Sequence, residues 1–529
     1  MSRAERFALA ACAIASVVLR SIAFFHYRFD SDEPQHLHVA WGWTAGLVQY
    51  RDYFDNHAPL FHLLTAPLLA FLGERSNILF YMRAAMLPLF LIVIVCTYLL
   101  VERLYAQRVA LWSAVLLSLF PTFFLKSLEY RNDNLWNALW MIALIVVISA
   151  PPSPGRWFVA GLLLGCALTV SMKTTLLGVT VAGAGVITRY ALRDRTRVVA
   201  PAIAAAAGFV IIPAIVAGYF ASIGALPNLV YCVITFNAVL EKMRPDLGLL
   251  GVAGIVFVAW RYRDSDIRRM FCAMTVSLFC VTLLTFWILI SPRDLLPIMP
   301  IGAMFLVAAF ERFDGRVVIC VVTAVVFIGL LFYYANRFQN HTEEFVTMIN
   351  QVLRLTRPGE PLMDIKGETI YRKRPFYYIF ETITRLEINR RFIRDTVPEA
   401  VVSARCHVAQ ADGPLFPPRA REFLNANFMD LGRLRASGQW IQPDGAFSIA
   451  VPGPYVAVNE RGEASGSLDG STYTGARELA AGTHRFVRAE NERVAVIWAR
   501  AFERGFSPFH LQDRNFRYRG RHSHSKRYR

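Results

Sequence analysis

Apolar blocks of about 16 to 24 residues, separated by short polar connections, recur along residues 1–335. A helix needs about 20 apolar residues to cross the hydrocarbon core of a bilayer. The whole chain is 55% hydrophobic and only 18% charged, whereas soluble domains carry about 25% charged residues. We therefore predict a polytopic α-helical membrane protein and exclude a soluble enzyme or a disordered chain.

Eleven of these blocks are candidate membrane spans. The first could be a secretory signal, but Arg20 interrupts it and many spans follow, so we interpret it as a retained transmembrane helix. The block at 60–73 is too short to span and is interpreted as a juxtamembrane or re-entrant helix. The predicted spans are about 7–25, 78–101, 108–125, 134–150, 157–172, 174–190, 199–220, 247–260, 271–291, 295–311 and 317–335.

The distribution of basic residues predicts the orientation. With the N-terminus in the cytoplasm, the inner side carries fifteen basic residues and the short outer connections carry six, as the positive-inside rule requires. Residues 336–529 then lie outside. The preference for arginine and the short loops indicate a bacterial inner (plasma) membrane. The outer six are Lys126, Arg131, Lys173, Lys242, Arg244 and Arg293.

The composition changes after residue 335, and the charge excludes one class of partner. We predict a mixed α/β region at 336–440, a β-sandwich-like region at 441–513 with short strands at 447–451, 454–458 and 493–499, and a basic disordered tail at 514–529. The net charge of +17 reflects the basic cytoplasmic loops. Because no basic stripe alternates with stacking aromatic residues, we predict no nucleic-acid partner.

The first outer loop, within 26–77, concentrates ionisable residues between aromatic ones. One interpretation is a solvated linker. We favour a loop folded onto the membrane surface, because Trp41, Trp43, Tyr50, Tyr53 and Phe54 would pack there and hold carboxylates at the interface. The ionisable residues are Asp30, Asp32, Glu33, His36, His38, Asp52, Asp55, His57 and His62.

Further charges lie at the outer ends of predicted spans. Glu129, Arg131 and Asp133 alternate within 126–136, where the alternative is interfacial anchoring by Lys126 and Trp136. Charges near membrane depth are costly and often face a cavity, although long side chains can also extend to the interface. The isolated cations of this kind, which predict a site on the outer side, are Arg83, Lys173 and Arg293.

These motifs resemble those of membrane-embedded GT-C glycosyltransferases, in the branch with protein O-mannosyltransferases, aminoarabinose transferases of lipid A and lipopolysaccharide galacturonosyltransferases. The matching elements in residues 1–335 are Asp32-Glu33, the stretch from Gly46 to Asp52, Pro59-Leu60, the run from Glu129 to Asp133, Lys173, and the loop with Arg293, Pro297 and Pro300. Aminoarabinose transferases have a lysine before a Pro-Pro-Leu motif. Here His57 and Ala58 stand there, which leaves the partner of the phosphate open.

The resemblance implies a GT-C transmembrane catalytic domain at 1–335 that uses a polyprenyl-phosphate-linked sugar donor and a glycan, lipid or protein acceptor among membrane lipids. It implies that Asp32 is the catalytic base, assisted by Glu33, in an inverting single displacement. No cofactor is certain; His36 and His38 are candidate ligands of a divalent metal, or instead hydrogen-bond at a wet interface. With such a donor, cations would stabilise the phosphate leaving group, and the sugar or acceptor would meet polar side chains. The residues suited to the donor phosphate are Arg131, Lys173, Arg293 and Arg83, and the predicted sugar- or acceptor-binding residues are Asp133, Glu129, His57 and Asp55.

Two other functions would require different sequence features. A transporter or flippase of a lipid-linked glycan would need polar residues at the bilayer midplane and repeated halves, and the sequence has neither feature. A non-catalytic cell-envelope assembly protein, acting through its outer domain, would leave the Asp32-Glu33 loop without a role. The arginine-rich segment at 371–394 is suited to attracting anionic lipid or lipopolysaccharide phosphates.

Overall fold

The structure is a computed structural model, which describes residues 1–238, 245–287, 290–411, 415–490 and 492–509. The predicted disordered tail at 514–529 lies outside the described residues. The chain divides into two compact units. Unit 1 comprises residues 1–73 and 77–345, and unit 2 comprises residues 74–76 and 346–529.

Unit 1 is helical, with a helix or an interrupted pair of helices at each of the eleven predicted span positions. Within the described residues, five are long and apolar enough to cross a membrane: Arg3–His26, Ile78–Leu104, Val199–Ser222, Ile267–Phe286 and Arg316–Tyr334. The helices at these positions are α1 (Arg3–His26), α4 (Ile78–Ala84), α5 (Leu87–Leu104), α6 (Gln107–Leu119), α7 (Pro121–Lys126), α8 (Asn132–Ile148), α9 (Pro154–Leu168), α10 (Thr174–Ala191), α11 (Val199–Ser222), α13 (Pro245–Arg261), α14 (Ile267–Phe286), α15 (Met299–Phe310) and α16 (Arg316–Tyr334).

Short helices lie in the connections of unit 1. The 13-residue α3 corresponds to the block interpreted as juxtamembrane, and it packs against α2. These short elements are α2 (Asp32–Thr44), α3 (Leu60–Leu72), α12 (Leu226–Leu229), the π-helix η1 (Val230–Thr235), and the 3-10 helices η2 (Phe236–Ala238), η3 (Pro292–Leu295) and η4 (Asn336–Phe338).

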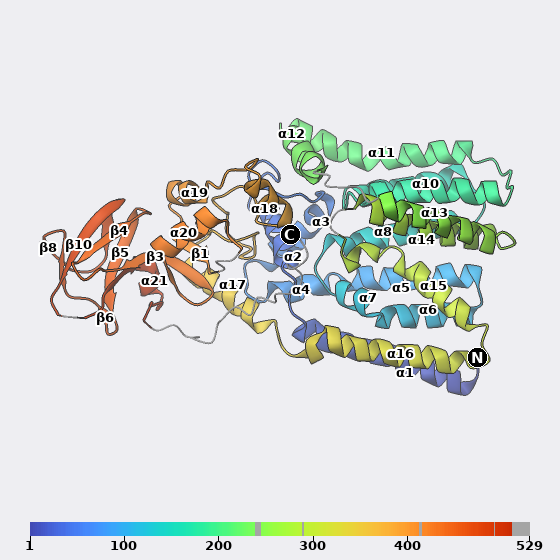
Figure 1. The fold of residues 1–529 in the computed structure, drawn as a ribbon, viewed down its shortest axis with the longest axis horizontal. Helices are drawn as coiled ribbons and strands as arrows, with labels where there is room; N and C mark the ends of the chain where they lie inside the picture. Colours follow the sequence, from blue (N-terminus) through green and yellow to red (C-terminus); the bar gives the residue numbers. More distant parts are fainter. Residues whose placement is uncertain (239–244, 288–289, 412–414, 491, 510–529) are drawn as a thin grey trace. The chain divides into compact units, whose positions relative to one another are not determined.

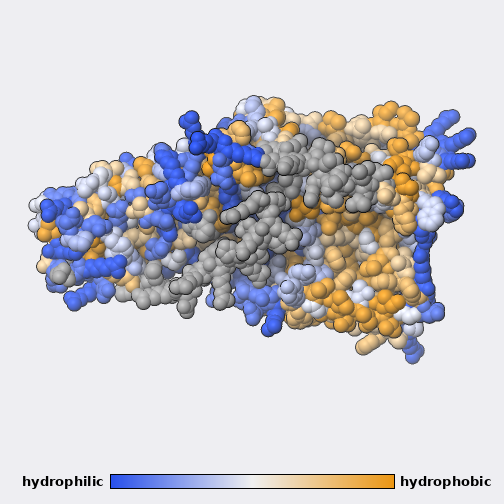
Figure 2. All heavy atoms as spheres, in the orientation of Figure 1, coloured by the Kyte–Doolittle hydropathy of each residue, from blue (hydrophilic) through white to orange (hydrophobic). Residues whose placement is uncertain are grey.

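The surface of unit 1 fits an apolar environment. Figure 1 shows its long helices running side by side, and Figure 2 shows hydrophobic side chains gathered over them. Val186, Val199, Ile203 and Val318 are each more than 60% exposed. Large exposed apolar surfaces are rare on soluble proteins and are expected where a helix meets lipid. Unit 1 is therefore built as a multi-pass membrane bundle.

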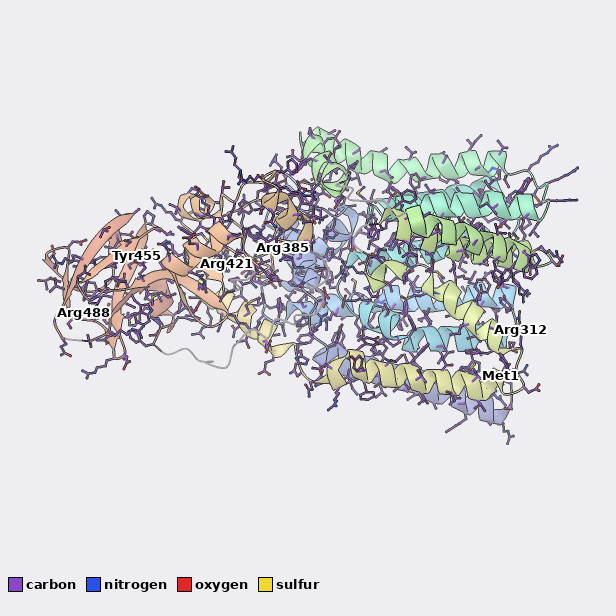
Figure 3. The ribbon with its side chains drawn as sticks, viewed as in Figure 1. Met1, Arg312, Arg385, Arg421, Tyr455 and Arg488 are labelled. Atoms are coloured by element: carbon purple, nitrogen blue, oxygen red, sulfur yellow. The ribbon has the colours of Figure 1, made fainter. Side chains whose placement is uncertain are left out.

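The two ends of this bundle differ. Figure 3 shows Met1 and Arg312 at the same end of the helices, although more than 300 residues separate them. Both belong to segments that were predicted to be cytoplasmic. Helix α1 begins at Arg3, beside Met1, and ends at His26, at the opposite end of the bundle. The connection from α1 to α2 therefore starts at that opposite end.

Unit 2 mixes helices and antiparallel strands. The helix predicted near 341–356 is α17 (Glu343–Leu355), which belongs to this unit from Val346 onward, and the predicted strands correspond to β4, β5 and β11. The other helices are α18 (Thr382–Asn389), α19 (Val397–Ser403), α20 (Pro418–Asn427) and α21 (Ala499–Glu503). The strands are β1 (Val408–Gln410), β2 (Phe428–Asp430), β3 (Leu434–Trp440), β4 (Ala446–Ile449), β5 (Gly453–Asn459), β6 (Gly462–Glu463), β7 (Gly466–Leu468), β8 (Ser471–Thr472), β9 (Arg477–Leu479), β10 (Gly482–Arg488) and β11 (Ala495–Trp498).

The strands form two sheets. A seven-stranded sheet has the order β1-β3-β11-β5-β6, with β2 paired to β3 and β9 paired to β5, and a four-stranded sheet has the order β4-β10-β7-β8. Central β11 places Val496 opposite both Gln439 of β3 and Ala457 of β5. Strands from both sides of residue 440, the predicted boundary between the two outer regions, therefore share one sheet.

Candidate active site

The Asp32-Glu33 pair begins helix α2, directly after α1. Both carboxylates lie in the first turn of α2, where the helix dipole stabilises negative charge. Their environments differ: the Asp32 side chain is 21% exposed, whereas that of Glu33 is fully buried. Two adjacent acids of the sequence therefore have different chemical surroundings.

Glu33 is fully occupied by partners. Its Oε1 lies 2.5 Å from Arg83 Nη2 and its Oε2 lies 2.8 Å from Arg83 Nε. The backbone N–H groups of Asp30 and Tyr130 also donate to it, at 2.8 and 2.9 Å. Arg83 in turn donates to the carbonyl oxygens of Tyr27 and Arg28. This buried ion pair joins α4 to the start of α2 and to the loop before α8.

Arg131 is the centre of the charges around Asp32. Its Nη1 lies 2.6 Å from Asp32 Oδ2 and 3.1 Å from Asp30 Oδ1, and its Nε lies 3.3 Å from Asp133 Oδ2. The same Asp32 oxygen accepts a hydrogen bond from Arg293 Nη1 at 3.0 Å. Asp32 thus lies between two guanidinium groups that come from connections distant in the sequence.

Two lysines extend this arrangement. Lys173 Nζ lies 3.0 Å from Asp133 Oδ1 and 2.6 Å from Asp294 Oδ1. Lys126 Nζ lies 2.7 Å from Glu129 Oε1 and 3.5 Å from Asp30 Oδ2. We name the whole set the charged cluster, which consists of Asp30, Asp32, Lys126, Glu129, Arg131, Asp133, Lys173, Arg293 and Asp294.

The charged cluster shifts the pKa of two acids in opposite directions. Burial alone would raise the pKa of Asp30, but the positive charges of Lys126, Arg131 and Arg28 outweigh it and lower that pKa to about 2. Burial, reinforced by the negative charge of Asp30, raises the pKa of Glu129 to about 7. Glu129 Oε2 is buried without a hydrogen-bond partner. Glu129 is therefore an acid that can exchange a proton near neutral pH.

A second polar group, the histidine group, comprises His36, Asp55, His57 and His62. Asp55 Oδ1 lies 2.8 Å from His57 Nδ1, and Gln49 donates to Asp55 Oδ2 at 2.6 Å. His36 Nδ1 lies 2.9 Å from His62 Nε2. Burial, together with the charge of His57, lowers the pKa of His36, which keeps its imidazole neutral.

The two candidate metal ligands do not form a pair. His36 faces His62, whereas His38 stacks on Trp41 with ring centroids 5.4 Å apart. Residues two positions apart on a helix point to different faces. Within the ranges that the structure describes, no set of three His, Cys, Asp or Glu side chains has an arrangement suited to a metal ion.

The structure thus brings together most of the residues predicted from the sequence. Asp32, Arg131, Asp133, Glu129, Lys173 and Arg293 meet in the charged cluster. Glu33 and Arg83 form the adjoining buried pair, and Asp55 and His57 belong to the histidine group.

Three members of the charged cluster were not predicted as site residues: Asp30, Lys126 and Asp294. Asp30 lies two residues before Asp32, Asp294 directly follows Arg293, and Lys126 was interpreted as a membrane anchor. The available signal was alternation of acid and base beside an already suspected residue, as in Arg293-Asp294.

Comparisons with known proteins agree on the membrane part of the chain. The family described as dolichyl-phosphate-mannose-protein mannosyltransferase matches residues 56–220. No curated protein matches the sequence.

Solved structures match over more of the chain. ArnT from Cupriavidus metallidurans in the apo state has a TM-score of 0.56 at 13% identity, covering 81% of this chain and 97% of that chain. The same protein bound to undecaprenyl phosphate has a TM-score of 0.54 at 13% identity, covering 80% of this chain and 97% of that one. The chain has the fold of ArnT, and its predicted resemblance to the GT-C glycosyltransferases is confirmed.

Proposed function

We propose that this chain transfers a sugar from a polyprenyl-phosphate-linked donor to an acceptor hydroxyl on the periplasmic side of a bacterial inner membrane. The observation that carries the proposal is the position of Asp32, one of whose oxygens contacts both Arg131 and Arg293. Transfer from a phosphate leaving group requires a carboxylate that can act as the base, close to cations that stabilise the phosphate. The structural likeness to ArnT, which has been solved bound to undecaprenyl phosphate, supports a lipid-linked donor.

The proposed transfer needs no nucleotide, because the polyprenyl phosphate is the leaving group. The acceptor oxygen forms a bond to the anomeric carbon while the bond from that carbon to the phosphate oxygen breaks. The electron pair of the broken bond remains on the polyprenyl phosphate, and the hydroxyl proton passes to Asp32, the general base. A single displacement of this kind inverts the anomeric configuration.

The cations stabilise the leaving group. Arg131, Lys173 and Arg293 each supply N–H donors near Asp32 or Asp133, and we assign them to the donor phosphate. The Arg293 side chain is 31% exposed, which leaves it room to turn from Asp32 toward a phosphate. Asp133 and Glu129 are assigned to hydroxyls of the sugar or acceptor.

Glu33 and Arg83 are better suited to positioning than to binding. The sequence placed Arg83 on the donor phosphate, but its guanidinium group is occupied by Glu33 and two backbone carbonyls. We assign this pair to holding the first turn of α2, and hence Asp32, in place. The histidine group keeps its assignment to the acceptor side through Asp55 and His57, and the acceptor class remains a glycan, a lipid or a protein.

The change Asp32→Asn tests this function, because it preserves the shape of the side chain and removes the base. Loss of a general base lowers the rate by about 100-fold to 10,000-fold. We expect mass spectrometry of surface glycans to show loss of one sugar unit, with unchanged protein levels in the membrane. Purified Asp32→Asn protein should still bind undecaprenyl phosphate in native mass spectrometry, since the cations remain.

The matched control is Asp264→Asn, in a connection predicted to be cytoplasmic, where the aspartate side chain is 89% exposed. It should transfer sugar at the normal rate. Full transfer by Asp32→Asn would overturn the catalytic assignment and favour a transporter or an assembly protein.

A further inference from the structure

Unit 2 contains a pocket of about 310 Å³, and five of its ten lining residues are arginines. It lies between the end of α17, the loop that follows this helix, and the end of α21. Its charged lining residues are Glu74, Arg354, Arg357, Arg372, Arg500 and Arg504. The sequence drew attention to arginines at 371–394, but only Arg372 of that segment lines this pocket.

Two of the five guanidinium groups are neutralised within the protein. Arg372 Nη1 lies 2.9 and 3.0 Å from the two oxygens of Glu74, and its other nitrogens donate to the hydroxyl and carbonyl oxygens of Thr356. Arg500 pairs with Glu360 and lies over the ring of Trp498. These two arginines form a fixed wall of the pocket.

The other three guanidinium groups have no carboxylate partner among the described residues. Arg354 donates to the backbone carbonyl of Arg504 at 2.9 Å and lies 5.3 Å from the ring centroid of Phe506, so it is held in place without a carboxylate. Arg357 and Arg504 are exposed, and among the described residues their side chains have no ion-pair partner. Three positive charges therefore remain in one small cavity.

We propose that this pocket is a binding site for a phosphate group, either free or carried by a sugar. Guanidinium groups match the oxygens of phosphate with paired, charge-assisted hydrogen bonds. Three cations that come from two segments, the end of α17 with its following loop and the end of α21, suit a tetrahedral anion, which offers oxygens in several directions, whereas a carboxylate presents two oxygens in one plane. A bound anion also relieves the mutual repulsion of the three arginines.

The site is independent of the proposed sugar transfer, because none of its residues belongs to the charged cluster. A test can therefore fail for one and succeed for the other. We would titrate the full-length protein in an uncharged detergent with inorganic phosphate, glucose 6-phosphate, glucuronate and glucose, and measure binding by calorimetry.

The diagnostic variant is Arg357→Gln/Arg504→Gln, which changes two exposed side chains. Its matched control is Arg421→Gln/Arg461→Gln, which removes the same charge from exposed positions elsewhere in unit 2; Arg421 lies on α20 (Figure 3). We expect the wild type and the control to bind phosphate, and the diagnostic variant to bind it about tenfold or more weakly, because each lost arginine removes charge-assisted hydrogen bonds.

Comparing the titrations with glucose 6-phosphate and inorganic phosphate identifies the source of the phosphate. Tighter binding of glucose 6-phosphate than of inorganic phosphate indicates a phosphorylated glycan, and the reverse order indicates free phosphate. The proposal is overturned if no phosphate binds, if the diagnostic variant binds as the wild type does, or if glucuronate binds more tightly than both phosphates. Glucose alone should not bind.

Discussion

At the scale of single residues, burial separates the roles of two neighbouring carboxylates. Glu33 has four hydrogen-bond donors and no exposed surface, whereas Asp32 keeps a fifth of its side chain exposed beside two cations. A general base must be accessible to the substrate from which it takes a proton. A buried ion pair is stable only while both charges keep their partners. The geometry therefore favours Asp32 as the reacting residue and Glu33 as the residue that holds it.

The first residue-scale prediction concerns Arg83→Met. This change leaves the Glu33 carboxylate buried and uncompensated, which typically costs about 3–5 kcal/mol. We expect a lower thermal unfolding midpoint in detergent and a lower amount of protein in the membrane. The double variant Glu33→Gln/Arg83→Met should recover part of the loss, because the uncompensated charge is gone. A stable Arg83→Met protein with abolished transfer would instead place Arg83 on the substrate.

The second residue-scale prediction follows from the raised pKa of Glu129. The folded protein holds a proton at Glu129 up to about pH 7, whereas the unfolded chain releases it near the ordinary value of 4.5. Stability contributed by this proton is therefore present below that ordinary value and is lost as the pH rises to about 7. The lowered pKa of Asp30 does not alter the stability in this pH range, because its contribution to stability changes only below the ordinary pKa of 3.8.

The measurement compares thermal unfolding of the wild type and Glu129→Gln from pH 5 to pH 8. The wild type should lose stability relative to the variant as the pH rises, and the difference should become constant above about pH 7. A difference that is independent of pH would mean that Glu129 is ionised throughout this range.

At the scale of elements, close helix packing in unit 1 depends on glycine. Gly161 and Gly165 of α9 face the backbone of α11, where an added Cβ would overlap the carbonyl oxygens of Ala205 and Phe209. Gly208 of α11 faces Phe158 of α9 in the same way. Small residues let membrane helices approach closely enough for their backbones to pack. The close packing of α9 against α11 therefore depends on these glycines.

The element-scale prediction is that Gly161→Ala separates α9 from α11. Overpacking typically costs about 1–3 kcal/mol, so the thermal unfolding midpoint should fall. The matched control is Gly218→Ala, also in a helix of this pair, where an added Cβ meets no atom within 4 Å. It should leave the midpoint unchanged or raise it slightly, since alanine favours a helix. Equal effects of the two changes would show that the close approach is not needed.

Element positions were more predictable from the sequence than contacts between elements. Apolar blocks of membrane length placed a helix at every expected span, because the bilayer requires such blocks. The strands β1 to β3 were not predicted, since a segment such as LRASGQW in β3 contains no β-branched residue and is rich in small and polar residues, which have low strand propensity. The ion pairs of the charged cluster could not be predicted either. Arg293 contacts Asp32 across 261 residues, and only the folded bundle brings these two connections together.

At the scale of the whole molecule, the charged cluster is built from alternate connections of the bundle. Its residues follow α1, lie at the end of α7, between α7 and α8 or at the start of α8, lie between α9 and α10, and precede α15. Connections that alternate along a bundle of spanning helices lie on the same side of the membrane. The basic connections at 189–197 and 261–269 belong to the other set, and the positive-inside rule predicts that this set faces the cytoplasm.

The whole-molecule prediction tests this orientation with single cysteines at two exposed positions, Asp264→Cys in unit 1 and Ser471→Cys in unit 2. In intact spheroplasts, a membrane-impermeant maleimide should label Ser471→Cys alone, and Asp264→Cys should react only after permeabilisation. The wild type gives the background from its eight native cysteines, five of which are buried. The opposite labelling would place the charged cluster in the cytoplasm, where nucleotide sugars are available, and the argument for a lipid-linked donor would lose its basis.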